Sequence, residues 1–312
     1  MAALSVTEYR DRVLRQCETV IVGKRDVIEK VLICFLCSGH ILLEDVPGTG
    51  KTMLLRAFAA SVGGSFKRVQ FTPDLLPSDL TGINFYNQKS GEFQFRPGPI
   101  FANMVLADEI NRATPRTQSA LLEAMAERQV TVDGETHRMP EPFMIMATQN
   151  PLESQGTFPL PEAQTDRFFM RLSLGYMRRE QELSVLTGED TDDLVSRLTA
   201  CVTPEDTAAA KRAVRGVEVT ADVAGYLLDL VTATRSDTRI RIGVSTRGAL
   251  ALYRASQAAA ALQGRGYVTP EDVKALAPSV LAHRIVMAGA GRMTEGEELI
   301  GSLAETCRVP LE

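Results

Sequence analysis

The sequence predicts an α/β protein in which a parallel sheet with covering helices is followed by a second, helical part. Short apolar strands alternate with helices through about residue 172, which is typical of a parallel α/β sheet. After about residue 176 the chain becomes rich in Ala and Leu with a 3.6-residue period, which indicates packed helices. Because 312 residues leave room for two domains, we expect one over residues 1–175 and one over 176–312.

In the first part, amphipathic or buried helical patterns surround short apolar runs that end in polar clusters. The short apolar runs at 104–107 and 143–147 indicate buried strands. Helices are therefore expected over 7–20, 26–38 and 51–61, and strands over 41–44, 66–71, 104–107, 143–147 and 168–172.

Two hairpins are expected to interrupt this alternation. Residues 130–137 centre on Asp133-Gly134, the dipeptide that a two-residue type I′ turn favours. A second hairpin is expected over 83–95, around Lys89-Ser-Gly91, and it carries four aromatic residues. These aromatic side chains either form a contact surface or pack the hairpin against the sheet.

The second part contains helix-start signals. Thr203-Pro-Glu-Asp206 and Thr269-Pro-Glu-Asp272 each place Thr at the cap, Pro at the first helical position and acids in the first turn. Helices with a clear 3.6-residue period are expected over 221–233 and 246–262. The second domain is therefore predicted to be all-helical.

The charge and the cysteines restrict the function and the compartment. The net charge is -5, and acidic residues outnumber basic ones in both halves of the chain, which argues against a non-specific nucleic-acid surface. The apolar run from Val31 to Cys37 is too short to span a membrane. The N-terminus lacks the uncharged core of a signal peptide, and five cysteines are an odd number. We expect a cytoplasmic protein.

A phosphate-binding loop is predicted at Gly48-Thr-Gly-Lys51-Thr52, which follows a strand and opens a helix. Glycines allow backbone N–H groups to surround anionic oxygens. Lys51 would reach the β- and γ-phosphates, and the Thr52 hydroxyl would bind Mg²⁺. The usual pattern has another glycine where this chain has Asp45.

An acidic pair complements this loop. Asp108 and Glu109 end an apolar strand, and Asp108 lies 57 residues after Lys51. Parallel α/β sheets bind ligands at the edge formed by the carboxyl ends of their strands. Asp108 would hold Mg²⁺, and Glu109 would orient and polarise the attacking water. In isolation the pair could also be a solvated strand end.

Three further polar residues are weaker candidates. Asn150 ends the next strand and could sense the γ-phosphate, or form an ordinary turn before Pro151. Arg167 could stabilise transition-state charge at a neighbouring subunit's nucleotide, or be a surface charge. Arg247 begins a helix of the second domain and could contact phosphate across the domain cleft, or simply be exposed.

Several stretches together resemble the MoxR family of AAA+ ATPases over roughly residues 20–310. They are Asp108-Glu-Ile-Asn-Arg-Ala113, Gln118-Ser-Ala-Leu-Leu-Glu-Ala-Met125, Glu127-Arg-Gln-Val130, Ala147-Thr-Gln-Asn-Pro151 and Glu162-Ala-Gln-Thr-Asp-Arg-Phe168. The resemblance implies an AAA+ P-loop core with a five-stranded parallel sheet of order 5-1-4-3-2, a helical lid and a ring that is usually hexameric. It also implies that the hairpins are the helix-2 insert and the hairpin before sensor 1.

The resemblance further implies the roles of individual residues. Asn150 would be sensor 1, Arg167 the arginine finger from the neighbouring subunit, and Arg247 sensor 2 in the subunit that holds the nucleotide. Thr246 and Gly248 depart from the family, which more often has Pro before this Arg and Ala after it. Asp108 and Glu109 would form Walker B, and Val22 and Gly23 would contact the adenine. Walker A and the residue before it would consist of Pro47, Gly48, Thr49, Gly50, Lys51 and Thr52.

The resemblance implies that MgATP hydrolysis drives chaperone-like assembly, activation or remodelling of client proteins, often with a partner that carries a von Willebrand factor A (VWA) domain. Three alternatives stay open: a nucleic-acid motor, a magnesium-chelatase-type motor, and a nucleotide-gated scaffold with little turnover. The acidic charge argues against the first, and the stretches at 118–125 and 147–151 fit the chelatase less well.

Overall fold

The centre of the protein is a five-stranded parallel sheet, in a computed structural model that describes residues 4–46, 48–149, 156–289 and 293–309. The spatial order is β2-β5-β8-β1-β9. Numbered along the chain these strands are 2-3-4-1-5, so the predicted order 5-1-4-3-2 is confirmed. The bounds are β1 Ile41–Glu44, β2 Phe66–Gln70, β5 Met104–Asp108, β8 Met144–Gln149 and β9 Met170–Leu172.

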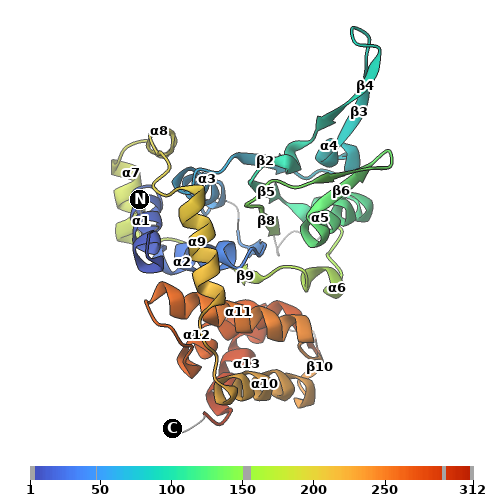
Figure 1. Cartoon of the computed structure of the whole chain (residues 1–312). Helices are drawn as coiled ribbons and strands as arrows, with labels where there is room; N and C mark the ends of the chain where they lie inside the picture. Colours follow the sequence, from blue (N-terminus) through green and yellow to red (C-terminus); the bar gives the residue numbers. More distant parts are fainter. Residues whose placement is uncertain (1–3, 47, 150–155, 290–292, 310–312) are drawn as a thin grey trace.

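Helices cover both faces of this sheet (Figure 1), which is why its central strands are apolar up to the polar residues at their carboxyl ends. In β5, Met104 and Leu106 join one buried cluster, whereas Val105 and Ala107 join the other, as the two-residue period of a strand requires. The first cluster contains α1 (Val6–Glu18), α2 (Arg25–Leu36) and α3 (Lys51–Ser61), and the second contains α4 (Pro77–Thr81), η1 (Pro99–Phe101) and α5 (Pro115–Glu127).

Two antiparallel hairpins project beside α5 (Figure 1). The first pairs β3 (Gly82–Asn87) with β4 (Glu92–Pro97), and the second pairs β6 (Gln129–Val132) with β7 (Glu135–Arg138). Asp133 and Gly134 have φ values of 50° and 86°, so the predicted two-residue turn is confirmed. The rings of Phe95 and His137 stack with centroids 3.8 Å apart, which joins the two hairpins near their bases.

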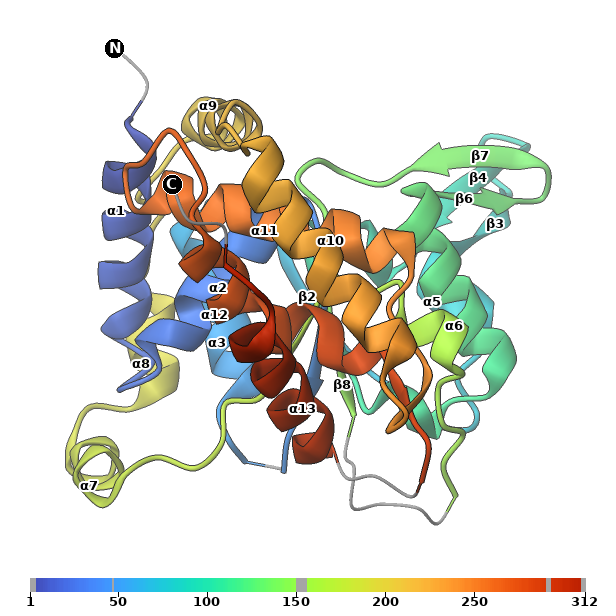
Figure 2. The same ribbon diagram turned by 90° about the horizontal axis from the view of Figure 1, so that it is seen from below.

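The second part is built mainly from helices, which Figure 2 shows in front of the sheet. Its prediction as all-helical is wrong in one detail, because β10 (Ile240–Ile242) and β11 (Val286–Met287) form a small antiparallel sheet. The helices are α7 Arg179–Thr187, α8 Thr191–Ser196, α9 Pro204–Arg215, α10 Ala221–Ser236, α11 Thr246–Leu262, α12 Pro270–Leu281, η3 Ala282–Arg284 and α13 Met293–Thr306; the short η2 (Ile110–Arg112) and α6 (Glu162–Thr165) precede them in the first part.

The predicted helix caps explain where these helices begin. The Thr203 hydroxyl accepts a hydrogen bond from Asp206 N at 3.1 Å, and the Asp206 carboxylate accepts one from Thr203 N at 3.0 Å, a reciprocal capping box. The Asp272 carboxylate accepts from Thr269 N at 2.9 Å in the same way. In the described part of the chain, no helix is both long and apolar enough to cross a membrane.

Candidate active site

The loop between β1 and α3 has the backbone that a phosphate-binding loop needs. Gly48 and Gly50 have φ values of 81° and 89°, and residues with a Cβ atom rarely adopt this backbone conformation. The space around both glycines is open, so backbone conformation, and not crowding, requires glycine there. Lys51 and Thr52 open the 11-residue helix α3, so the partial positive charge of its N-terminus faces the loop.

The loop, the acidic pair and the end of β8 line one cavity of about 330 Å³. The carboxyl ends of β1, β5 and β8 meet at the same edge of the sheet, where such folds bind ligands. Pro47 and Asn150 lie outside the described residues. The described lining comprises Asp45, Gly48, Thr49, Gly50, Lys51, Thr52, Met53, Arg68, Asp108, Glu109, Thr148 and Gln149.

Neighbouring strands hold the Asp108 carboxylate. Its Oδ1 accepts a hydrogen bond from the Thr148 hydroxyl at 2.7 Å, and its Oδ2 accepts from Arg68 at 2.5 and 3.1 Å. The Thr148 oxygen in turn accepts from Glu109 N at 2.8 Å. Asp108 and Thr52 therefore present hard oxygen atoms to the same cavity, and such oxygens are the ligands that Mg²⁺ prefers. The residues present fit a magnesium–polyphosphate group.

The Glu109 carboxylate has two partners of its own. Its Oε2 accepts from Gln70 Nε2 at 2.6 Å and lies 3.0 Å from Arg112 Nε. The φ of Glu109 is 58°, a strained conformation for a residue other than glycine, and such strain often occurs at functional sites. Sequence reasoning missed Arg68 and Gln70, although strand order places β2 beside β5, with Gln70 opposite Asp108.

Asp45, which stands where the usual loop has a glycine, anchors a distant segment. Its buried carboxylate accepts hydrogen bonds from Leu174 N at 2.7 Å, Gly175 N at 3.0 Å and Val46 N at 3.0 Å. Lys24 Nζ also holds that segment, since it donates to the carbonyl oxygens of residues 174, 175 and 176. The start of the loop and the segment after β9 are thereby fixed to each other.

Lys51 lines the cavity, whereas the residues expected to contact adenine, Val22 and Gly23, lie outside its described lining. Lys51 Nζ donates to the carbonyl oxygens of Asp45 at 3.2 Å and Val46 at 3.0 Å. A Cβ added to Gly23 would meet the Gln181 amide at 1.9 Å, so Gly23 lies directly against the first turn of α7.

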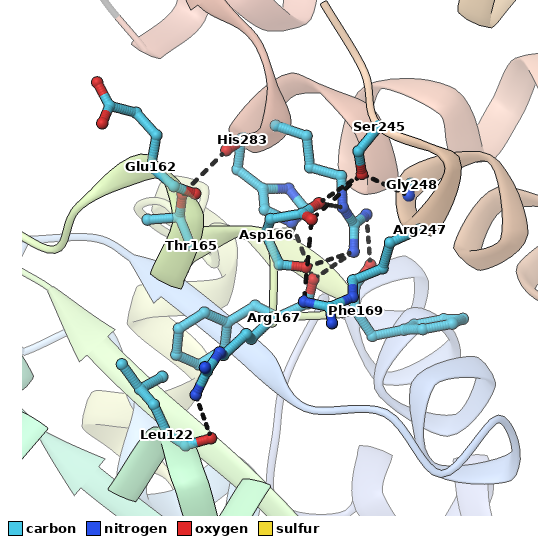
Figure 3. Close-up of polar contacts among 12 residues, drawn as sticks. Leu122, Glu162, Thr165, Asp166, Arg167, Phe169, Ser245, Arg247, Gly248 and His283 are labelled. Carbon is cyan, nitrogen blue, oxygen red and sulfur yellow. Dashed lines mark hydrogen bonds and ion pairs between the residues drawn. The ribbon is translucent and has the colours of Figure 1, made fainter. Parts of the chain in front are cut away.

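The two predicted arginines each lie beside Asp166 (Figure 3) and outside the described lining of this cavity. Arg167 is exposed and donates to Leu122 O at 3.0 Å. Arg247, with a side chain 60% exposed, lies 4.0 Å from the Asp166 carboxylate, and Figure 3 shows both arginines beside Asp166. The start of α11 packs beside Asp166 through Ser245, which places Arg247 there. Contact of Arg247 with phosphate in its own chain stays a prediction.

Comparisons with known proteins agree with this architecture. The family described as "ATPase family associated with various cellular activities (AAA)" matches residues 40–170, and "AAA lid domain" matches residues 232–302. YeaC of Bacillus subtilis, described as uncharacterized, is 48% identical over 94% of this chain and 92% of its own. Chaperone MoxR1 of Mycobacterium tuberculosis is 40% identical over 89% of this chain and 75% of its own. A crystal structure from Cytophaga hutchinsonii, proposed to be an ATPase, superposes with a TM-score of 0.87 at 37% identity and covers 98% of this chain and 97% of its own.

Proposed function

Because the chain belongs to the MoxR family of AAA+ ATPases, we propose that it hydrolyses MgATP at interfaces between identical subunits. The energy would drive chaperone-like assembly, activation or remodelling of client proteins. The observation that carries this proposal is the cavity that brings Lys51 and Thr52 of one segment together with Asp108 and Glu109 of another. The working assembly is a hexameric ring in the cytoplasm.

Each residue of the cavity has a role in this proposal. The loop of residues 47–52 would bind the phosphates through backbone N–H groups and Lys51. Bound Mg²⁺ would neutralise phosphate charge, and Thr52 and Asp108 would hold it. Glu109 would orient the attacking water and accept its proton, after its carboxylate is released from Gln70 and Arg112. Asn150 would hydrogen-bond the γ-phosphate or this water, and Val22 and Gly23 would pack on the adenine.

The two exposed arginines would serve the neighbouring subunit. Arg167 and Arg247 both lie beside Asp166, as Figure 3 shows, and outside the described lining of their own cavity. In the proposed ring with head-to-tail contacts, this surface of one subunit would face the nucleotide of the next. Both guanidinium groups would then stabilise negative charge that develops on the γ-phosphate. This assigns Arg247 to the neighbour's nucleotide, in contrast to the sequence-based assignment.

The hairpin β3–β4 is the proposed contact with clients or with a VWA-domain partner. Tyr86 and Phe93 are 54% and 73% exposed, although they pair across the strands with ring centroids 5.4 Å apart. Phe95 instead packs within the protein, as the alternative from sequence proposed, because its half-buried ring stacks on His137. The exposed aromatic pair near the hairpin tip therefore supports an interaction surface, and the packed ring near its base supports a structural role. The name of Chaperone MoxR1 supports protein clients.

Replacement of Glu109 by Gln tests the proposal. The variant should bind ATP as the wild type does and lose hydrolysis, since the amide cannot accept the proton. Glu123→Gln, at an exposed acid of α5, is the matched control and should keep full activity. Unchanged turnover in Glu109→Gln would indicate a scaffold whose hydrolysis does not use this site. Stimulation of the wild-type ATPase by DNA, but not by a client or VWA protein, would favour a nucleic-acid motor.

A further inference from the structure

Arg284 is a buried charge that the roles above do not use. It lies in η3, after α12, and its side chain is only 2% exposed. Burial of a guanidinium is unfavourable unless its charge and its N–H groups are satisfied. Here Nε donates to Asp166 Oδ1 at 2.8 Å, and Nη1 also donates to Val280 O within the same lid segment.

The remaining contacts of Arg284 surround Arg167. Nη2 donates to Phe168 O at 2.6 Å and to Asp166 O at 3.4 Å, and Nη1 donates to Phe169 O at 3.4 Å. These carbonyl groups lie between the end of α6 and the start of β9. Arg284 therefore fixes the backbone on both sides of Arg167. His283 adds a contact of 3.0 Å between Nε2 and Phe168 O.

The same carboxylate also holds the start of α11. Ser245 Oγ donates to Asp166 Oδ2 at 3.2 Å and Oδ1 at 3.3 Å, and the Arg247 guanidinium lies 4.0 Å from Oδ2. Figure 3 shows Ser245, Arg247 and Arg167 around Asp166. The ion pair of Arg284 and Asp166 thus contacts the backbone beside Arg167. It also contacts the Ser245 side chain near Arg247.

Gly248 makes room for this ion pair. A Cβ at Gly248 would lie 2.8 Å from Arg284 Cδ and 2.5 Å from Val244 Cγ1, both closer than real Cβ contacts. Gly248 is helical and has no positive φ, so space, and not backbone conformation, calls for glycine. The glycine after Arg247, which the sequence showed as a departure from the family pattern, is therefore explained by the stem of Arg284.

We propose that Arg284, with Asp166 and the space left by Gly248, is a positioning residue that sets Arg167 and Arg247 toward the neighbouring subunit's nucleotide. The inference rests on the proposed function, because it requires that these two arginines act between subunits. A planar guanidinium is required, since it distributes N–H groups over several acceptors in fixed directions, whereas a lysine ammonium has three donors on a flexible stem. The lid would thereby control the alignment of the arginine finger.

Subunit mixing tests this inference in the assembled ATPase. Arg284→Lys should lower ATP turnover roughly 100-fold, the effect of a displacement of about 1 Å in a reacting arrangement, while its own ATP affinity stays unchanged. Mixed with Glu109→Gln subunits, which keep a normal arginine surface, it should regain activity. Mixed with Arg167→Ala subunits it should not, because both partners then lack a working arginine surface.

Two further variants keep the test decisive. Gly248→Ala should place a methyl group against the Arg284 stem and show the same mixing pattern with a smaller loss, even if Arg284→Lys folds poorly. Arg239→Lys, at an exposed lid arginine paired with Asp237 two residues away at 2.7 Å, is the control and should keep full turnover.

The outcomes separate the inference from the function it rests on. Recovery of Arg284→Lys by Arg167→Ala subunits, recovery by neither partner, or unchanged turnover would each overturn the positioning role. Failure of Glu109→Gln and Arg167→Ala to restore each other would instead overturn hydrolysis between subunits, whatever the behaviour of Arg284→Lys.

Discussion

Replacement of Asp45 by glycine should destabilise the protein, although it restores the residue that phosphate-binding loops usually have at this position. The loop pattern alone predicts a neutral or favourable change. The structure predicts the opposite, because the carboxylate accepts hydrogen bonds from Leu174 N and Gly175 N, which lie about 130 residues away in sequence. Removal of the side chain detaches the start of the loop from the segment that leads toward α7.

The magnitude follows from these bonds. A hydrogen bond to a charged group contributes about 1.5–3 kcal/mol to stability. The lower value applies because water can enter the space left by the side chain, so loss of the two long-range bonds should cost about 3 kcal/mol. Glycine adds about 0.5–1 kcal/mol through the greater freedom of the unfolded chain. At about 2 °C per kcal/mol for a chain of this size, the melting temperature should fall by roughly 7–8 °C.

Thermal and urea unfolding at one fixed protein concentration measure this change, since assembly makes stability depend on concentration. Asp74→Ala, at an exposed acid, is the control and should change stability by less than about 0.5 kcal/mol. A double-mutant cycle with Lys24→Met should show coupling, because both side chains act on residues 174–176. A glycine variant as stable as the wild type would refute the anchoring role of Asp45.

Three other predictions concern the arginine surface, the hairpin and pH. Arg167→Ala should lower ATP turnover roughly 10³-fold or more with ATP affinity unchanged, and full turnover would exclude action between subunits. Alanine at Lys89 and Glu92 should leave basal turnover intact but weaken stimulation by a partner protein; undiminished stimulation would remove the hairpin as the contact. Burial lowers the pKa of His40 to about 4, so the unfolded chain, with a His pKa near 6.5, binds more protons between these values. The free energy of unfolding should therefore fall as pH falls below 6.5, and this residue should account for about 2 kcal/mol of the loss at pH 5. Urea unfolding at pH 7 and pH 5 measures the loss, and His40→Asn should lack the part that His40 contributes. An equal loss in the variant and the wild type would contradict this prediction.

The features that follow from local sequence were predictable. The glycines of the loop, the acidic pair after β5 and the Asp133-Gly134 turn each have a local physical cause: positive φ, a buried strand that ends in polar residues, and a preferred turn dipeptide. Their assembly into one cavity also followed, since parallel strands bring their carboxyl ends to one edge. The strand order came from the family resemblance, because alternation of strands and helices leaves the order open.

Features that depend on distant contacts were not predictable. The carboxylate that Ser245 contacts is 79 residues away in sequence, and this contact decides where Arg247 lies. Arg284 carries no periodic or motif signal, because a buried charge is recognised only from the partners that surround it. The anchoring role of Asp45 was not predictable either. The loop pattern shows that a glycine is absent at this position, but it does not show which hydrogen bonds the Asp45 carboxylate makes.

ATP turnover of rings assembled from equal amounts of Glu109→Gln and Arg167→Ala subunits tests the central claim most directly. Each variant alone should be inactive, the first in its own cavity and the second toward its neighbour. In a random cyclic ring, about one quarter of the interfaces pair an intact cavity with an intact arginine surface, so turnover should rise to roughly that fraction of the wild-type rate. A mixture as inactive as its two components would contradict hydrolysis shared between neighbouring subunits.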